Sequence, residues 1–297
     1  MYPAEFEYFA PTTVDEALTL LARYGDDAKI LAGGQSLLPM MKLRIASPRV
    51  LIDVNRIDSL SGFRRDGDCL RIGALCRHAE IAGSPLVRAH LPIMTDAANL
   101  TADVQVRNRG TVGGSLAHAD PAGDWPTALL ALETAVTITA PGGSRTVPLA
   151  AFIIDAYTTT LGPGEMLTGI SVPFSRRPCG GAYLKFEKRA GDFAVASVGI
   201  QLETGDGGAI RSVAISLGAV GAAPIRATAA EDVLRDTGAP PPAIDEAARL
   251  VREAAQPFED TRGSVEYKRH LAGVLFRRAL AVAMDRARGN EVPSRHV

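Results

Sequence analysis

The chain has 297 residues, 46% of them hydrophobic, which is enough to form two domains with cores of their own. Its 32 lysines and arginines are balanced by 33 aspartates and glutamates, and the formal net charge at pH 7 is -1. This balance excludes the broad basic surface that attracts nucleic acid, so we expect no nucleic-acid partner. No apolar run reaches the length of about 18 residues that a membrane span requires, so we expect no membrane span.

The N-terminal residues and the cysteines bear on location and redox chemistry. Glu5 and Glu7 lie where a secretory signal would carry first basic and then apolar residues, which favours a cytoplasmic protein. The three cysteines are Cys69, Cys76 and Cys179, and none is spaced as C-x-x-C. The sequence therefore predicts no disulfide framework, no structural zinc and no other metal site in this chain.

The first elements along the chain are a helix and a β-turn-α-β unit. The helix is predicted over residues 14–24, because Thr13 and Glu16 have the spacing of a capping box and Gly25 is suited to end it. The elements that follow are a buried strand, a glycine turn, a short helix and a second strand, at 28–33, 33–36, 36–44 and 49–54. Together they predict a first subdomain of about 1–55.

A second subdomain is predicted for residues 56–176. Asp66 and Gly67 lie between two alternating segments, which indicates a hairpin, and residues 76–100 are expected to form one or two helices. Further on, the pattern predicts a glycine turn, a helix and a second hairpin, at 110–115, 125–133 and 135–149. The mixture of proline, glycine and arginine in FSRRPCGGAY marks the end of this first domain, 1–176.

The C-terminal domain is predicted to span residues 177–288, followed by a tail at 289–297. Its first half contains three strand-like runs separated by glycine-rich turns, and its second half is helical. The helices are expected at about 228–236, 243–255 and 265–288. A small antiparallel sheet followed by helices is an α+β arrangement.

Two glycine segments carry the clearest signal of a binding site, and they read Gly33-Gly34-Gln35-Ser36 and Thr111-Val112-Gly113-Gly114-Ser115. Paired glycines permit positive φ and close backbone approach, and consecutive N–H groups in such a turn form a nest that binds anions. Two such segments suit a pyrophosphate held from both sides. Each segment alone is as typical of a plain tight turn between a strand and a helix.

Other polar residues nearby give weaker signals. His118 and Asp120 follow the second glycine segment, but no nucleophile motif accompanies them, so hydrolase chemistry is disfavoured. Asp124 is placed to accept hydrogen bonds from ribityl or ribose hydroxyls. Lys185 and Phe193 lie at the start of the second domain, where a cleft between domains is expected, although a solvated lysine and a core phenylalanine fit the pattern equally. No catalytic residue is predicted.

The segments AGGQSLLPMMKLR and RGTVGGSLAHADPAGDWP resemble the two flavin-binding motifs of the FAD-binding medium subunits of molybdenum hydroxylases. This family includes xanthine dehydrogenase and carbon monoxide dehydrogenase, and the resemblance is greatest to the carbon monoxide dehydrogenase medium chain. It extends over almost the whole chain through APTTVDEAL, GEMLTGISVPF, YLKFEKRAGDFAVASV and EYKRHLAGVLFRRAL.

The resemblance implies a fold and a cofactor. The fold is α+β, with a two-subdomain FAD-binding domain of the vanillyl-alcohol oxidase type followed by a small C-terminal α+β domain. The glycine segments would hold the FAD pyrophosphate through their N–H groups, and Asp124 would bind ribityl or nearby hydroxyls. Leu167 would pack against the flavin or adenine, and Lys185 would approach the isoalloxazine edge. The implied cofactor-binding residues are Ala32, Gly33, Gly34, Gln35, Ser36, Leu37, Thr111, Gly113, Gly114, Ser115, Asp124, Leu167, Lys185 and Phe193.

Two positions depart from the carbon monoxide enzyme that the chain resembles. Gln35 replaces a histidine, which leaves a backbone role intact but changes any side-chain contact with the phosphates. Phe193 replaces a tyrosine that is thought to cover one flavin face, so the ring can still stack but lacks the hydroxyl. Both changes weaken the case for carbon monoxide as the substrate.

The resemblance also implies a role in a larger enzyme. Electrons would pass from two [2Fe–2S] clusters in a small subunit to the FAD in this chain and then to an external acceptor. A large subunit would carry molybdopterin cytosine dinucleotide, and the assembly would be a dimer of heterotrimers. Two alternatives remain: a stand-alone flavin oxidoreductase that binds its substrate between the two domains, and a non-catalytic nucleotide-binding or assembly module.

Overall fold

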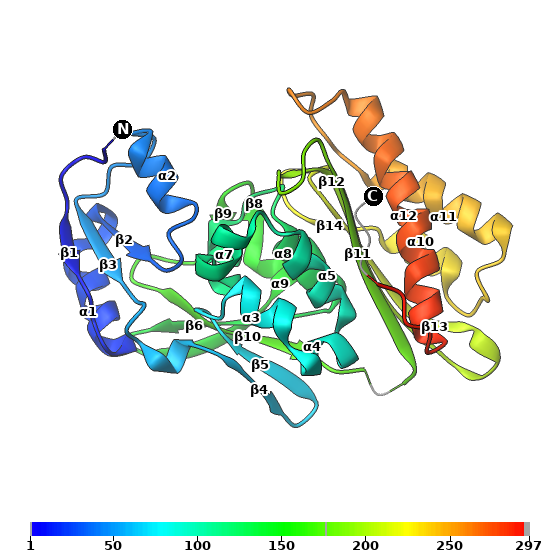
Figure 1. Ribbon diagram of the computed structural model, residues 1–297, viewed down its shortest axis with the longest axis horizontal. Coiled ribbons are helices and arrows are strands. Elements are labelled where there is room, and N and C mark those ends of the chain that lie inside the picture. The colour runs from blue at the N-terminus through cyan, green and yellow to red at the C-terminus, as the bar shows by residue number, and fades with distance from the viewer. Residues whose placement is uncertain (1, 176, 294–297) are drawn as a thin grey trace.

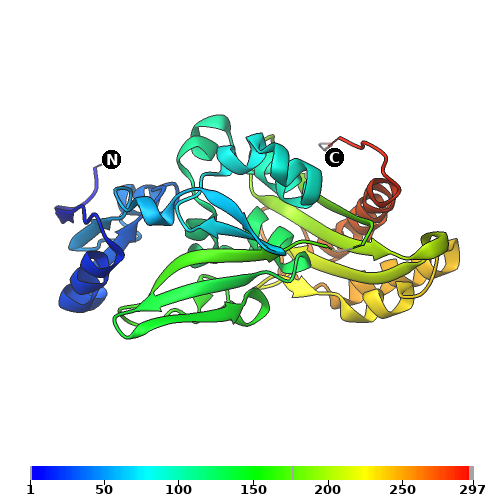
Figure 2. The ribbon, with the colours of Figure 1, turned by 90° about the horizontal axis from the view of Figure 1, so that it is seen from below.

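The protein is described by a computed structural model that covers residues 2–175 and 177–293. Three lobes follow one another along the long axis of the molecule in chain order, as Figures 1 and 2 show. Each lobe is built on a sheet of its own, and helices accompany every sheet. The expected α+β class is therefore confirmed.

The N-terminal lobe contains a parallel three-stranded sheet in the order β1-β3-β2. The helix predicted over 14–24 is present, because Thr13 Oγ1 accepts from Glu16 N and the Glu16 carboxylate accepts from Thr13 N. Its Ala17 and Leu18 pack on the strands in a small core. The elements are β1 Glu7–Phe9, α1 Val14–Tyr24, η1 Gly25–Asp27, β2 Ala28–Leu31, α2 Leu37–Lys42, β3 Val50–Asp53 and η2 Asp58–Leu60. The first strand, β1, was not predicted.

The middle lobe is an antiparallel five-stranded sheet in the order β4-β5-β10-β6-β7. Ile72, Ile170 and Val136 lie side by side on its buried face and join the core formed with the helices. Figure 2 shows the strands from the opposite face, which the helices leave uncovered. The strands are β4 Phe63–Asp66, β5 Cys69–Gly73, β6 Ala135–Ala140, β7 Gly143–Pro148 and β10 Met166–Pro173, with a separate pair β8 Ile153–Asp155 and β9 Thr158–Thr159.

The helices of this lobe differ from the prediction in two places. Residues 76–100 form three helices because Ser84 caps one of them and Pro85 and Pro92 begin new ones. The predicted second glycine turn is also helical, since Gly113 and Gly114 lie in the first turn of α7. The helices are α3 His78–Gly83, α4 Pro85–His90, α5 Pro92–Leu100, α6 Val104–Arg109, α7 Val112–His118, α8 Asp124–Ala131 and α9 Leu149–Phe152.

The C-terminal lobe has the predicted antiparallel strands followed by helices, and the sheet order is β11-β12-β13-β14. One face of the sheet packs on α12 and the other on α5 and α8 of the middle lobe, which Figure 1 shows on either side of β11 and β12. The two domains therefore share a packed interface. The elements are β11 Cys179–Glu187, β12 Ala194–Thr204, η3 Asp206–Gly208, β13 Ile210–Gly218, β14 Ile225–Arg226, α10 Thr228–Leu234, α11 Pro241–Ala254 and α12 Val265–Ala287.

The predicted domain limits of 1–176, 177–288 and 289–297 stay predictions. The boundary falls on residue 176, and the last four positions of the tail are 294–297, all of which lie outside the described residues. In the part that is described, β10 ends at Pro173, β11 begins at Cys179 and α12 ends at Ala287. No helix within residues 2–175 and 177–293 is long and apolar enough to cross a membrane.

Candidate cofactor site

The first glycine segment, Gly33 to Leu37, connects β2 to α2 at the surface of the N-terminal lobe. Across the described chain, the backbone N–H groups of these five consecutive residues have no protein acceptor. Gly34 has φ +74°, a conformation that a glycine adopts without strain. Consecutive N–H groups without protein acceptors form a concave nest for an anion. This segment therefore has the donors that a phosphate requires.

The second glycine segment uses its N–H groups within the protein. Val112 N donates to Cys76 O at 3.0 Å and Gly113 N to Ala74 O at 3.0 Å. Gly114 N donates to Thr111 Oγ1 at 3.1 Å, and Ser115 N donates to Thr111 O at 3.0 Å. Nearby carbonyl and hydroxyl oxygens thus already accept these four N–H groups, so the expectation that residues 112–115 offer them to a phosphate finds no unoccupied donor here and stays a prediction. The Ser115 hydroxyl has no partner among the described residues, and contact of this segment with a cofactor stays a prediction.

The structure brings the two glycine segments into contact. A Cβ placed on Gly33 would lie 2.4 Å from the carbonyl oxygen of Arg109 and 2.8 Å from Gly110 Cα. A Cβ on Gly114 would lie 3.9 Å from the Cβ of Ala32. Only glycine permits the first of these approaches, since real Cβ contacts are longer. The residues predicted around positions 33 and 114 thus share one site.

A polar network joins these segments, and the sequence reasoning missed it. Tyr8 Oη donates to Asp53 Oδ2 at 2.6 Å, and Asp53 Oδ1 accepts from Asn55 N at 2.9 Å. Asn55 Oδ1 accepts from Arg77 Nη2 at 2.6 Å. Burial opposes ionisation of Asp53, but the hydrogen bonds from Tyr8 and Asn55 outweigh it and lower the pKa of that carboxyl. The position of Asp53 and Asn55 at the end of a predicted strand was a usable signal for this network, whereas Arg77 carried none.

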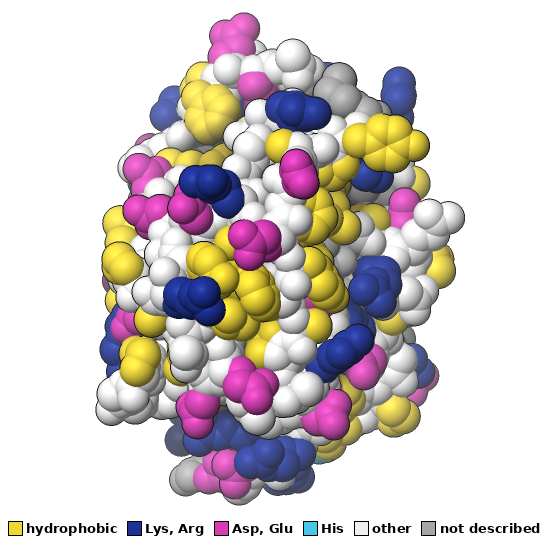
Figure 3. Space-filling view, turned by 90° about the vertical axis from the view of Figure 1, so that its left-hand side faces the viewer, with side chains coloured by type: hydrophobic (Ala, Val, Ile, Leu, Met, Phe, Trp, Pro, Cys, Tyr) yellow, Lys and Arg dark blue, Asp and Glu magenta, His cyan; other side chains and the backbone are white. Residues whose placement is uncertain are grey.

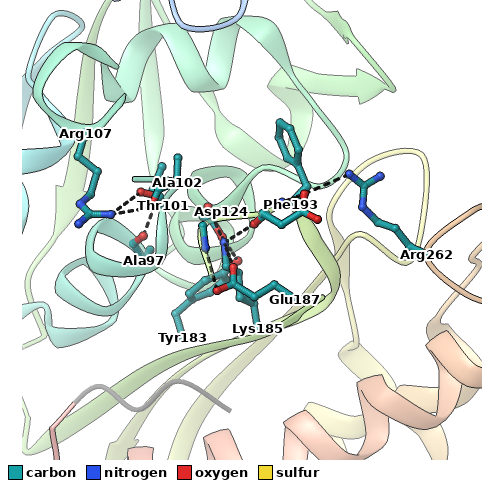
Figure 4. A network of polar contacts seen from close by, with 12 residues as sticks. Ala97, Thr101, Ala102, Arg107, Asp124, Tyr183, Lys185, Glu187, Phe193 and Arg262 are labelled. Carbon is teal, nitrogen blue, oxygen red and sulfur yellow. Dashed lines mark hydrogen bonds and ion pairs between the residues drawn. The ribbon is translucent and has the colours of Figure 1, made fainter. Parts of the chain in front are cut away.

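Asp124 and Lys185 form a buried ion pair between the two domains, drawn in Figure 4. Lys185 Nζ lies 3.2 Å from Asp124 Oδ1 and 3.0 Å from Glu187 Oε2, and Tyr183 Oη donates to Asp124 Oδ1 at 2.8 Å. Burial raises the pKa of Asp124 against the opposing effect of Lys185. These groups bind one another across the domain interface, and their contacts with the flavin stay predictions.

Phe193 and Leu167 have opposite surroundings. The Phe193 side chain is 50% exposed, and the Arg262 guanidinium lies 5.7 Å from its ring centroid. Figure 4 labels both residues. Lys185 Nζ donates to the carbonyl oxygen of Asp192 at 3.0 Å, which connects Phe193 to the buried pair. Leu167 is buried in the core of the middle lobe. Because this side chain is buried, it offers little surface to a cofactor, and its predicted contact stays a prediction.

Two protein families match the chain. The FAD binding domain in molybdopterin dehydrogenase matches residues 4–175, and the CO dehydrogenase flavoprotein C-terminal domain matches residues 181–283. The fold and the matches define an FAD-binding flavoprotein subunit of an oxidoreductase. The chain belongs to the family of medium subunits of molybdenum hydroxylases, so the resemblance predicted from the two glycine motifs is confirmed.

Individual relatives agree with this assignment over almost their full length. The carbon monoxide dehydrogenase medium chain of Hydrogenophaga pseudoflava is 41% identical, with 96% of this chain and 99% of the relative covered. The 6-hydroxypseudooxynicotine dehydrogenase complex subunit alpha of Paenarthrobacter nicotinovorans is 37% identical, with 97% of each covered. A solved structure of carbon monoxide dehydrogenase from Hydrogenophaga pseudoflava superposes with a TM-score of 0.94 at 43% identity, covering 96% of this chain and 99% of that one. The names of these relatives point to different substrates, so the likeness does not identify one here.

Proposed function

We propose that this chain is the electron-transfer subunit of a molybdenum hydroxylase. It would accept electrons from [2Fe–2S] clusters of a small partner subunit and deliver them through its FAD to an external acceptor. A large partner subunit would carry molybdopterin cytosine dinucleotide, in a dimer of heterotrimers. The observation that carries the proposal is the row of N–H groups from Gly33 to Leu37 without protein acceptors, placed against the second glycine segment.

The residues of the site fit the cofactor that the family match names. The N–H groups of the first segment would hold the pyrophosphate, and glycine at 33 permits the close approach of this segment to the carbonyl oxygen of Arg109. When bound, FAD would allow electrons to pass between one-electron carriers and two-electron carriers, as such an enzyme requires. The chain's own task is to hold and orient this group.

The polar groups near the domain interface are suited to positioning. Asp124, Tyr183 and Lys185 are buried and hydrogen-bonded or ion-paired with one another. A general acid or base must lie within hydrogen-bond distance of the proton that it transfers. Electron transfer through a flavin requires no such side chain from the protein. This supports the proposal over the alternative of a stand-alone oxidoreductase with a substrate bound between the domains. A cytoplasmic location stays a prediction of the sequence.

The surface at the N-terminal end of the molecule is mixed in charge. Figure 3 shows basic and acidic side chains interspersed there around a hydrophobic area, and neither sign dominates. A nucleic-acid partner would require a predominantly basic face. This face agrees with the balanced charge of the whole chain, with a formal net charge of -1 at pH 7, and we include protein partners and no nucleic acid in the proposal.

The test is to isolate the complex that contains this chain from its own host. We expect FAD, molybdenum and iron in the complex, with a large and a small subunit bound. After removal of FAD, reduction of the iron–sulfur clusters by substrate should persist while reduction of the external acceptor stops; restoring FAD should restore it. A monomer that binds FAD and oxidises its own substrate without partners would contradict the proposal.

A further inference from the structure

Two side chains, Asn55 and Arg77, connect the backbone just before the first glycine segment to the backbone just before the second. Asn55 Nδ2 donates to the carbonyl oxygen of Ala32 at 2.8 Å, directly before Gly33. Arg77 Nη2 donates to Asn55 Oδ1 at 2.6 Å, and Arg77 Nη1 donates to the carbonyl oxygen of Arg109. That same carbonyl oxygen is the atom against which Gly33 packs. The contacts therefore close a ring that begins and ends at the first glycine segment.

The ring of contacts includes residues of both subdomains, and the backbone on each side is held by regular structure. Asn55 follows β3 of the N-terminal lobe, and Arg77 caps α3 of the middle lobe. The backbone N–H of Arg77 donates to Glu80 Oε2 at 2.6 Å, and the next residue, His78, donates its N–H to Gly110 O at 3.2 Å. The Arg77 guanidinium thus reaches out from a fixed backbone.

The orientation of the Asn55 amide is also fixed. Asp53 Oδ1 accepts from Asn55 Nδ2 at 2.5 Å and from Asn55 N at 2.9 Å, and Tyr8 Oη donates to the other Asp53 oxygen at 2.6 Å. With Nδ2 directed to Asp53 and Ala32, the amide oxygen is left to accept from Arg77. A charged donor in this position makes the bond to Asn55 strong.

The geometry of the peptide unit connects this ring to the nest. The peptide that joins Ala32 to Gly33 is planar and trans, so its C=O and N–H point in opposite directions. Holding the carbonyl oxygen of Ala32 toward Asn55 therefore directs the N–H of Gly33 away from Asn55, as the first donor of the row from Gly33 to Leu37. Holding the Arg109 carbonyl fixes the surface on which Gly33 rests.

We propose that Asn55 and Arg77 are positioning residues for the FAD pyrophosphate, which fix the spacing and orientation of the two glycine segments and so determine how tightly FAD is retained. This inference rests on the proposed function, since it takes the pyrophosphate to lie at these segments. Asp53 and Tyr8 act through Asn55. Neither Asn55 nor Arg77 has to touch the cofactor.

The test measures FAD binding to the full-length chain after removal of flavin, by titration with FAD and quenching of its fluorescence. Arg77→Gln and Asn55→Ala should each raise the Kd for FAD about tenfold or more, because each leaves a backbone carbonyl without its donor. The double variant should bind about as weakly as either single variant, since both remove the same ring. The matched control is Arg71→Gln, which removes an exposed arginine that pairs with Asp66 in the β4–β5 hairpin, and its Kd should stay within about twofold of wild type.

Two further measurements separate positioning from a general loss of structure. Adenosine diphosphate, which carries the pyrophosphate, should lose affinity in Arg77→Gln as FAD does, whereas riboflavin, which lacks it, should not. Arg77→Lys keeps the charge without the two-branched donor and should give a smaller loss in Kd, with the apoprotein unfolding as wild type does. A loss of riboflavin binding equal to that of FAD in Arg77→Lys, or a Kd for FAD within about twofold of wild type in Arg77→Gln, would overturn the inference. Wild-type protein that binds no FAD would overturn the proposed function instead.

Discussion

The two glycine segments have nearly the same composition and different roles in the fold. In the segment from Gly33 to Leu37 the N–H groups have no protein acceptor, and the backbone lies at the surface. In the segment from Val112 to Ser115 the N–H groups bind carbonyl and hydroxyl oxygens, and Gly113 lets α7 pack closely on Ala74, which directly follows β5. A pair of glycines therefore indicates close approach, and the neighbouring acceptors determine whether a ligand or the protein takes the N–H groups.

The largest effect on stability is expected when a side chain is added to the second segment. A Cβ on Gly113 would lie 2.6 Å from both the Cβ and the carbonyl oxygen of Ala74. We expect Gly113→Ala to lower the free energy of unfolding of the apoprotein by about 3 kcal/mol, because backbone atoms cannot move aside cheaply. Urea denaturation measures this. The control is Gly83→Ala, where a Cβ meets nothing within 4 Å; equal stability of the two variants would refute the packing role.

Adding a side chain to the first segment should affect the ligand more than the fold. A Cβ on Gly33 would lie 2.4 Å from the Arg109 carbonyl oxygen and would force the two segments apart. Gly33→Ala should raise the Kd for FAD about a hundredfold, which corresponds to about 3 kcal/mol, with a smaller change in the stability of the apoprotein. Equilibrium titration with FAD checks the first value and urea denaturation the second. Unchanged affinity would show that the pyrophosphate lies elsewhere.

The packing of His78 against Gly110, directly before the second segment, should make the stability of the protein sensitive to acid. The His78 ring is 4% exposed, stacks 5.6 Å from the Trp125 ring and would be 2.6 Å from a Cβ on Gly110. Burial lowers the pKa of His78 to about 4, with smaller contributions from Arg77 and Arg107. The unfolded chain takes up this proton near pH 6.5, so the stability contributed by the neutral ring is complete above about pH 6.5 and is lost as the pH falls to about 4.

At pH 5 this loss should amount to about 2 kcal/mol relative to pH 7. Urea unfolding of wild type at the two pH values, with His78→Phe as the comparison, isolates the contribution, because the phenyl ring can stack but cannot take a proton. The exposed His90 offers a control in His90→Gln, which should behave as wild type. An equal pH dependence in His78→Phe and wild type would exclude this histidine as the cause.

The smallest effect on FAD binding is expected at Gln35, the position at which the resemblance to the carbon monoxide enzyme predicts a histidine. Its side chain is exposed and has no protein partner in the described ranges, and its N–H belongs to the nest. Gln35→Ala and Gln35→His should both keep the Kd for FAD within about threefold of wild type, because the backbone donor is unchanged. A larger change in titrations with FAD would mean that the side chain itself contacts the phosphates.

Much of this fold follows from local sequence patterns. The capping box at Thr13 and Glu16, the hairpin at Asp66 and Gly67 and the order of strands before helices in the last domain were all predicted correctly, because each depends on neighbouring residues. The short strand β1 was missed because its three residues gain their order from pairing with β3, which lies more than forty positions away.

The candidate site was predictable in part. The motifs placed the glycine segments together, but the acceptors of the second segment come from Ala74 and Cys76, which no local pattern connects to it. The pairing of Asp124 with Lys185 likewise spans 61 positions. Its burial could not be inferred from residue type, since lysine and aspartate are usually exposed. Contacts of this kind depend on tertiary packing and require the structure.

The central claim is that the N–H groups of Gly33 to Leu37 hold the FAD pyrophosphate while those of Val112 to Ser115 remain bound to the protein. Amide proton and nitrogen NMR resonances of the isotopically labelled apoprotein, recorded during titration with FAD, test this directly. We expect downfield amide proton shifts for Gly33 to Leu37, as their N–H groups gain a charged acceptor, and small shifts for Val112 to Ser115. Large shifts confined to Val112 to Ser115, with Gly33 to Leu37 unchanged, would contradict it.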